Sequence, residues 1–132
     1  MAEKKDLKVL VAEDNPSLRK VICNIVRKLG YGEVAEAEDG TQAWALLEAG
    51  GIDLLLTDWA MPGLSGMDLL KKLRASDGDL ERIPVVMITA ADTKNEIIEA
   101  GKEGVDAYVI KPFNVTTIGE KMEEALRNRA RS

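Results

Sequence analysis

Five side chains that can do chemistry lie at the ends of four apolar segments. Glu13 and Asp14 end the first segment, Asp58 and Thr89 end two others, and Lys111 ends the last. A parallel sheet brings the carboxyl ends of its strands to one edge, so we expect three carboxylates, a hydroxyl and an ammonium to meet there. Such a set is suited to handling a phosphoryl group together with a divalent cation.

The carboxylates indicate which cation this would be. Three converging carboxylates repel one another, and a hard cation with oxygen ligands offsets that repulsion, so Glu13, Asp14 and Asp58 predict a Mg²⁺ site. Asp58 can act as a nucleophile toward phosphorus and form an aspartyl phosphate. Lys111 supplies a fixed positive charge, and Thr89 offers a hydroxyl that can donate only when a phosphoryl oxygen is present. Singly, Asp58 could merely begin a turn and Thr89 could satisfy a strand end, but the four endings together favour the chemical role.

Strand and helix patterns alternate along the chain. We expect strands at residues 8–12, 33–37, 53–57, 84–89 and 107–110, and helices at residues 16–29, 41–49, 65–74 and 93–100 and after Asn114. Asn15 followed by Pro16 predicts the start of the first helix, and Gly30 predicts its end. Strict alternation predicts the α/β class, with a five-stranded parallel sheet covered by helices on both faces through right-handed crossovers.

Composition limits the class of protein. The chain has 132 residues, of which 45% are hydrophobic and 31% charged, so we expect a single domain, residues 1–132, with a folded core from about residue 7 to 130. No apolar stretch approaches the ~20 residues that span a bilayer, and no signal core follows Met1, so we expect no membrane association and a cytoplasmic protein. The net charge of −5 argues against a nucleic-acid partner.

The cysteine and histidine content excludes several kinds of site. Cys23 is the only cysteine and the chain has no histidine, which excludes an internal disulfide, a Cys- or His-ligated zinc site and a His-based triad. Cys23 falls inside the first helical pattern, so we expect a buried, unreactive thiol.

Together these residues resemble the receiver domain of two-component response regulators, in particular its single-domain, CheY-like members. The motifs that carry the resemblance are residues 9–15, 54–66, 85–90 and 107–113. The resemblance implies a flavodoxin-like, doubly wound sheet with strand order 2-1-3-4-5. It also implies a phosphoacceptor that promotes only its own phosphorylation and dephosphorylation and is otherwise not an enzyme.

The resemblance assigns roles to the site residues. Asp58 would be phosphorylated by a histidine kinase or a phosphotransfer protein. Mg²⁺ would be held by Glu13, Asp14, Asp58 and the backbone carbonyl of Ala60. Glu13 stands where many members have Asp, and it is one methylene longer, so it could bind through a metal-bound water instead. Lys111 would precede Pro112 across a cis peptide bond, which is plausible for an X-Pro bond.

The resemblance also implies an output surface. Tyr108 matches the switching aromatic of the family, whose ring turns inward when Thr89 moves toward the phosphoryl group; the alternative is a half-buried edge-strand aromatic. The output surface would comprise the fourth helix, fifth strand and fifth helix, around Ile97, Lys102, Tyr108 and Met122. Met122, at helical spacing, fits the core better than a contact role. We expect a monomer.

Two positions depart from chemotaxis regulators, which commonly carry Asn and Glu where this chain has Ala60 and Ala91. Neither alanine can orient an attacking water, so we expect slower hydrolysis of the acyl phosphate than in a variant carrying Ala60→Asn with Ala91→Glu. The stretch after Asp58 looks like that of regulators acting on a flagellar motor switch, which is one candidate output protein. A phosphorelay intermediate or a phosphate sink is the alternative.

Other functions fit less well. A Mg²⁺-dependent aspartyl-phosphate hydrolase would need a second Asp two residues after the nucleophile, where this chain has Ala60. No glycine-rich nucleotide-binding run follows a strand. A degenerate receiver that only binds proteins would be expected to lose Asp58 or Lys111, and both are present.

Overall fold

Strands and helices alternate along the chain in the computed structural model, which describes residues 3–90 and 94–130. Within these residues the strands are β1 Lys8–Ala12, β2 Glu33–Ala37, β3 Leu54–Asp58, β4 Val85–Thr89 and β5 Ala107–Ile110. The helices are α1 Pro16–Lys28, α2 Gly40–Ala49, α3 Gly66–Arg74, α4 Lys94–Lys102 and α5 Val115–Ala130, preceded by a short 3-10 helix, η1, at Lys4–Asp6. The alternation is the predicted one, whereas η1 was not predicted.

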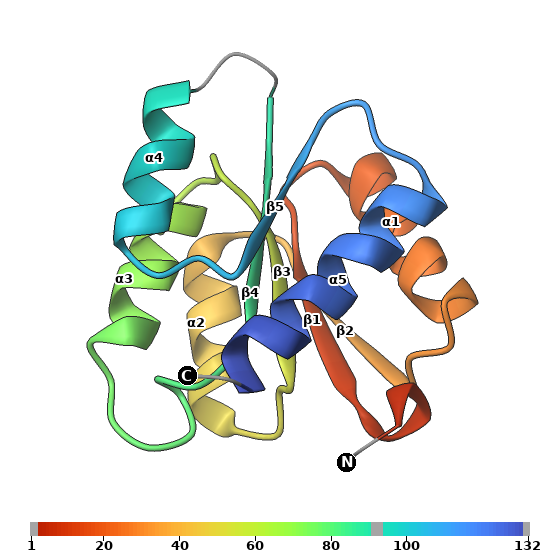
Figure 1. The fold of residues 1–132 in the computed structure, drawn as a ribbon, viewed down its shortest axis with the longest axis horizontal. Helices are drawn as coiled ribbons and strands as arrows, with labels where there is room; N and C mark the ends of the chain where they lie inside the picture. Colours follow the sequence, from red (N-terminus) through yellow and green to blue (C-terminus); the bar gives the residue numbers. More distant parts are fainter. Residues whose placement is uncertain (1–2, 91–93, 131–132) are drawn as a thin grey trace.

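The five strands form one parallel sheet in the order β2-β1-β3-β4-β5 (Figure 1). This is the doubly wound order that the resemblance implied. β1 pairs with both β2 and β3, so the strand order reverses there. A parallel sheet of this kind places its binding crevice at the carboxyl ends of the strands beside that reversal.

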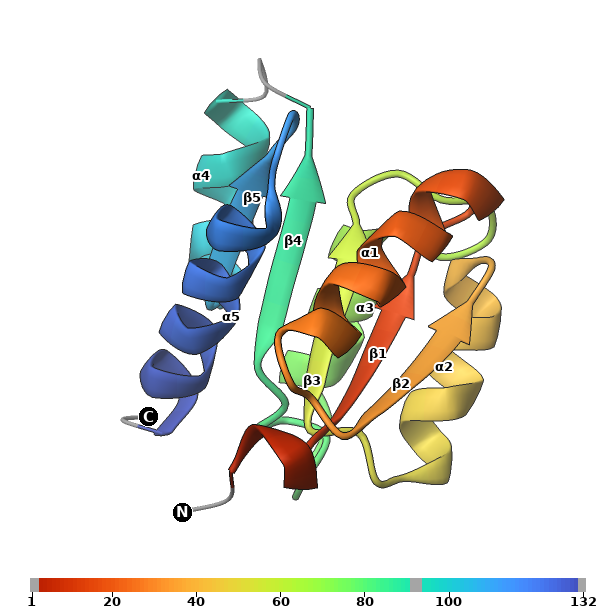
Figure 2. The ribbon, with the colours of Figure 1, turned by 90° about the vertical axis from the view of Figure 1, so that its right-hand side faces the viewer.

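Helices cover both faces of the sheet (Figure 2). Val9 and Leu54 belong to a core with residues of α1 and α5, whereas their neighbours Leu10 and Leu55 belong to a second core with residues of α2, α3 and α4. Burial on both faces explains why β1, β3 and β4 read as continuous apolar runs. Each fully buried leucine contributes roughly 1.5–3 kcal/mol to folding.

Local signals place the helix ends. The Asn15 side chain accepts the N–H of Leu18 at 3.0 Å, as the sequence predicted, and Gly30 follows α1 with a positive φ of 100°. The predicted cap at Asn114 is also present, because its Oδ1 accepts the N–H of Thr117 at 2.9 Å. The caps therefore confirm the predicted starts of α1 and α5.

A few predicted boundaries were wrong by one or two residues. Ser65 caps α3 in a capping box with Asp68 and does not belong to the helix. Strand β3 extends to Asp58, so Asp58 is itself the last strand residue. α4 continues to Lys102, beyond the predicted end, and its predicted first residue, Thr93, lies outside the described residues.

The Cys23 thiol is buried, with 1% of its surface exposed, which confirms its predicted place in the core. Burial raises the pKa of Cys23 to about 11, so the thiol is protonated at neutral pH. Among the described helices, none has the length and apolar character needed to cross a bilayer.

Candidate functional site

Three carboxylates meet at the carboxyl edge of the sheet, where the strand order reverses. Glu13 and Asp14 follow β1, and Asp58 ends the neighbouring strand β3. One oxygen from each of the three lies within 4.8 Å of the others. The topology therefore brings together the three acidic residues that the sequence singled out.

Glu13 is buried, with 1% of its surface exposed. Its Oε2 accepts the N–H of Asn15 at 3.1 Å, whereas its Oε1 is buried without a hydrogen-bond partner among the described residues. The pKa of Glu13 is raised to about 8, first by burial and also by the neighbouring Asp58 and Asp14 carboxyls, while the Asn15 N–H opposes the shift. A buried acceptor oxygen beside two other carboxylates is an environment that a hard, oxygen-preferring cation fits.

Asp58 is held from two sides. Its Oδ1 accepts the N–H of Trp59 at 2.8 Å, and its Oδ2 faces the Lys111 ammonium at 3.4 Å. Only 9% of Asp58 is exposed, so this ion pair is only partly screened by water. The carboxylate is thus oriented at the mouth of the site with a positive charge beside it.

Thr89 and Lys111 lie at the ends of the next two strands. Thr89 is the buried last residue of β4, and its hydroxyl donates to the Ala90 carbonyl at 3.4 Å. The Lys111 backbone N–H donates to the Thr89 carbonyl at 2.9 Å, and the Lys111–Pro112 peptide is cis, as the resemblance implied. A backbone hydrogen bond therefore links these two residues.

Comparison with known proteins identifies the family. The sequence matches the family model described as the response regulator receiver domain over residues 9–123, which contains almost all of the sheet. The chain belongs to the response regulator receiver domain family.

The similarity to curated proteins extends over nearly the whole receiver domain. The chemotaxis protein CheY of Pseudomonas aeruginosa is 45% identical over 118 residues, which are 89% of this chain and 94% of that protein. Chemotaxis protein CheY-3 of Vibrio cholerae is 42% identical over 120 residues, 91% of this chain and 92% of that protein. The chain is therefore similar to chemotaxis regulators of two-component signalling along most of its length.

Solved structures of similar proteins have the same fold. A response regulator receiver domain from Clostridium thermocellum aligns with a TM-score of 0.83 and 26% identity, covering 94% of this chain and 97% of that one. The receiver domain of the sensor histidine kinase PA1611 from Pseudomonas aeruginosa aligns with a TM-score of 0.78 and 29% identity, covering 94% and 98%. That structure has a magnesium ion coordinated in its active site cleft.

The residues of the predicted output surface differ in how far they are exposed. Tyr108 is 37% exposed on β5, and the Lys121 ammonium lies 5.7 Å from its ring centroid. Met122 is fully buried in the core shared by α1 and α5, which confirms the core position that its helical spacing favoured over a place on the output surface. Ile97 is half-buried, and its neighbour Ile98 is the more exposed of the two at 49%.

The structure adds two residues that the sequence did not single out. Arg19 of α1 donates to the Glu13 carbonyl at 2.9 Å and thereby fixes the backbone beside the carboxylates. Gly66 lies behind the acceptor, where a Cβ would meet the Asp58 carbonyl oxygen at 2.3 Å and the Met87 sulfur at 2.7 Å. Gly66 falls within the motif that resembles the family, whereas no local signal distinguishes Arg19 from other surface arginines.

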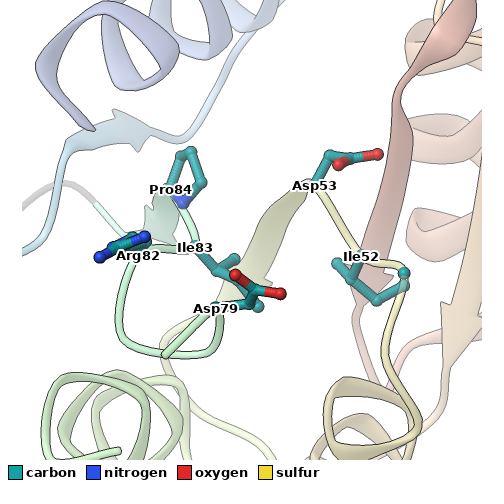
Figure 3. Close-up of a pocket in the computed structure, with 7 residues that line it drawn as sticks. Ile52, Asp53, Asp79, Arg82, Ile83 and Pro84 are labelled. Atoms are coloured by element: carbon teal, nitrogen blue, oxygen red, sulfur yellow. The ribbon is translucent and has the colours of Figure 1, made fainter. Parts of the chain in front are cut away.

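A cavity of about 360 Å³ lies away from this site (Figure 3). It opens where β3 and β4 begin, and its lining residues are Gly51, Ile52, Asp53, Asp79, Arg82, Ile83 and Pro84. Asp58 and Thr89 end the same two strands, so the cavity is at the opposite edge of the sheet from the carboxylates. This cavity is therefore separate from the acidic edge where Glu13, Asp14 and Asp58 meet.

Proposed function

We propose that the protein is a phospho-accepting signalling switch of a two-component system. Asp58 takes up a phosphoryl group from a histidine kinase or a phosphotransfer protein, and the phosphorylated form changes the surface that it presents to an output protein. The observation that carries this proposal is the convergence of Glu13 and Asp14 on an Asp58 carboxylate that Lys111 pairs from the other side. The protein is a phosphoacceptor and not an enzyme with an external product.

Mg²⁺ fits the acidic edge of the sheet. Glu13, Asp14 and Asp58 would hold it, together with the backbone carbonyl of Ala60, which lies in the loop after Asp58. When bound, the cation neutralises the acceptor carboxylate and the incoming phosphoryl oxygens. The buried Glu13 Oε1, which has no hydrogen-bond partner among the described residues, supports this assignment.

The chain's own residues account for the transfer step. An Asp58 carboxylate oxygen forms the new O–P bond while the P–N bond to the donor histidine breaks, and the electron pair of that bond stays on the histidine nitrogen. The Trp59 N–H and the Lys111 ammonium orient the carboxylate before attack. Lys111 then stabilises the charge on the transferred group, since it is already placed at 3.4 Å from the acceptor.

Thr89 and Tyr108 form the switch in this proposal. The Thr89 hydroxyl donates to the Ala90 carbonyl at 3.4 Å, and a negatively charged phosphoryl oxygen would be a stronger acceptor for it. Thr89 lies at the end of β4, and Tyr108 lies on the paired strand β5. A shift of Thr89 toward the phosphoryl group would free space beside β5 for the exposed Tyr108 ring.

Chemotaxis is the signalling pathway that the relatives favour. The two similar proteins from Pseudomonas aeruginosa and Vibrio cholerae carry chemotaxis names and match along nine tenths of the chain. On this basis the flagellar motor switch is the proposed output partner. A pull-down of motor-switch protein by the beryllofluoride-treated protein tests it: retention that needs beryllofluoride supports the motor, whereas no retention favours a relay intermediate or phosphate sink.

Phosphorylation is tested by intact mass. With acetyl phosphate and Mg²⁺, the protein should gain one phosphoryl group, and the Asp58→Asn variant should gain none. Omitting Mg²⁺ should abolish the gain. An equal mass gain in Asp58→Asn would reject Asp58 as the acceptor.

Metal binding is tested by the fluorescence of Trp59 in a Trp44→Phe background, which leaves Trp59 as the only tryptophan. Trp59 donates its N–H to Asp58, so occupation of the site should change its emission on titration with Mg²⁺. Asp58→Asn in the same background should weaken the response. A response that needs neither Mg²⁺ nor Asp58 would contradict the proposed site.

A further inference from the structure

A buried carboxylate joins two arginines at the edge of the sheet opposite the candidate site. Asp106 is 6% exposed and directly precedes β5. Its Oδ2 accepts from Arg74 Nη2 at 2.7 Å and from the Val85 N–H at 2.8 Å, and its Oδ1 accepts from Arg129 Nε at 2.8 Å. Charge-assisted hydrogen bonds of this length in a shielded place are strong and directional.

Arg74 extends the cluster to two loops. Its Nε donates to the Gly104 carbonyl at 3.0 Å, and its Nη1 donates to the carbonyls of Glu81 and Ile83 at 2.9 Å each. Gly104 has a φ of +90°, and a Cβ there would come within 3.3 Å of Arg74 Nε. One guanidinium at the end of α3 therefore holds the entry to β4 and the turn after α4.

Helix α5 is tied to the same point by its last turns. Arg129 binds the Asp106 carboxylate, and the Asn128 amide donates to the Asp106 backbone carbonyl at 2.8 Å. The end of α5 lies at the lower edge of the molecule in Figure 2, where the strands begin. Four elements, α3, β4, β5 and α5, thus meet at Asp106.

The two strands held at this edge are the ones that carry the proposed switch residues. Val85 begins the strand that Thr89 ends, and Asp106 precedes the strand that carries Tyr108. At the amino ends, removing a partner from a buried ion pair is costly because a charge is left unpaired. At the carboxyl ends, by contrast, the Tyr108 side chain is 37% exposed on β5. β4 and β5 are therefore held more firmly at their amino ends than at their carboxyl ends.

We propose that Arg74, Asp106 and Arg129 form a fixed anchor of the switching half of the molecule. The anchor keeps the amino ends of β4 and β5 in place, so that phosphorylation moves only their carboxyl ends and changes the position of Tyr108. Without the anchor, both strands would shift as rigid bodies and Tyr108 would respond less. This inference rests on the proposed function of Asp58. The three anchor residues act as positioning residues and touch neither the phosphoryl group nor the metal.

Amide NMR of the unaltered protein tests the anchor without any substitution. On addition of Mg²⁺ and beryllofluoride, the Lys111 amide resonance should move, whereas the Val85 amide, which reports the hydrogen bond to Asp106, should stay within a tenth of that displacement. A Val85 displacement equal to that of Lys111 would overturn the inference.

A variant pair then tests whether the anchor matters for output. The protein is labelled with 3-fluorotyrosine, which gives two fluorine signals, one from Tyr108 and one from the buried Tyr31 as an internal reference. Arg129→Met removes the hydrogen bond from Arg129 to the Asp106 carboxylate. Arg127→Met makes the same change at an exposed position of the last part of α5, two residues away.

With the anchor weakened, the displacement of the Tyr108 signal by beryllofluoride should fall by half or more in Arg129→Met and stay unchanged in Arg127→Met. The phosphoryl mass gain should be equal in both. Arg129→Lys, which keeps the charge but loses the guanidinium, serves if Arg129→Met does not fold and should also reduce the displacement. Wild-type displacement in the Arg129 variants would overturn the inference. If the unaltered protein shows neither a mass gain nor a Lys111 displacement, the proposed function fails first and the inference fails with it.

Discussion

At the scale of single residues, Glu13 occupies a place that suits a metal ligand better than a metal-free carboxyl. The Glu13 Oε1 is buried without a hydrogen-bond partner among the described residues, and burial together with the neighbouring carboxyls raises the pKa of Glu13 to about 8. A buried polar atom without a partner costs stability. The metal-free protein therefore bears a cost at this residue, and a bound cation would offset it.

Replacing Glu13 by Gln should separate stability from metal binding. Without Mg²⁺, Glu13→Gln should raise the free energy of unfolding by about 1–3 kcal/mol, because the raised pKa of Glu13 makes the folded protein take up a proton that the unfolded chain lacks at neutral pH, whereas the amide is neutral in both states. The same variant should bind Mg²⁺ more weakly. Urea unfolding with and without Mg²⁺ measures both effects. Glu48→Gln on the exposed side of α2 is the control, and a Glu13 variant less stable than this control in metal-free buffer would contradict the argument.

Ala60 and Ala91 set the expected lifetime of the phosphorylated state. Ala60 is exposed beside Asp58, and Ala91 lies outside the described residues. Neither methyl group can orient water, so Ala60→Asn combined with Ala91→Glu should speed the loss of the phosphoryl group about tenfold. Intact mass followed over time measures the decay, with the exposed Ala45→Asn on α2 as control. Equal decay of the double variant and the unaltered protein would reject this role.

At the scale of elements, the start of α5 rests on one side chain. Asn114 Oδ1 accepts both the N–H and the hydroxyl of Thr117, at 2.9 and 3.1 Å. This cap was predictable, because an Asn before an apolar helical pattern is a local signal that needs no knowledge of the rest of the fold. α5 also packs Ile118 and Met122 into the core beside α1, so the cap orients a core helix.

Removing this cap should cost stability without changing the site. Asn114→Ala should lower the free energy of unfolding by about 1 kcal/mol, since an N–H of the first turn loses its acceptor. Asn24→Ala, at an exposed position inside α1, is the matched control and should lose none. Urea unfolding compares the two variants. The cap would be unimportant if the two showed the same stability.

At the scale of the whole molecule, Cys23 reports on the common core. It lies 1% exposed in the cluster that joins α1, α5 and four of the strands, so a reagent can reach the thiol only when that core opens. Its pKa of about 11 adds a pH effect. Between the thiol pKa of the unfolded chain and a pH of about 11, Cys23 loses its proton in the unfolded chain and keeps it in the native protein. The free energy of unfolding should therefore fall as the pH rises through this range.

Thiol labelling should therefore respond to a metal at the far edge of the sheet. If Mg²⁺ binds only the native state, it should slow the labelling of Cys23 at neutral pH. The expected factor is one plus the ratio of the Mg²⁺ concentration to the Kd for Mg²⁺, or about elevenfold at ten times Kd. Ellman's reagent measures the rate, and sodium chloride at matched ionic strength is the control. Labelling that is fast in native buffer, or indifferent to Mg²⁺, would contradict the link between core and site.

The sequence by itself determined the alternation of strands and helices along the chain, the caps at Asn15 and Asn114 and the acidic edge of the sheet. Periodicity and capping depend on residues that are close in the sequence. A parallel topology places the carboxyl ends of the strands at one edge, so the proximity of Glu13, Asp14 and Asp58 could be predicted. Only the tertiary structure decided that Glu13 Oε1 is buried without a partner among the described residues and that Asp106 joins two arginines. These features depend on side-chain packing between segments that are distant in the sequence, and no local pattern encodes such contacts.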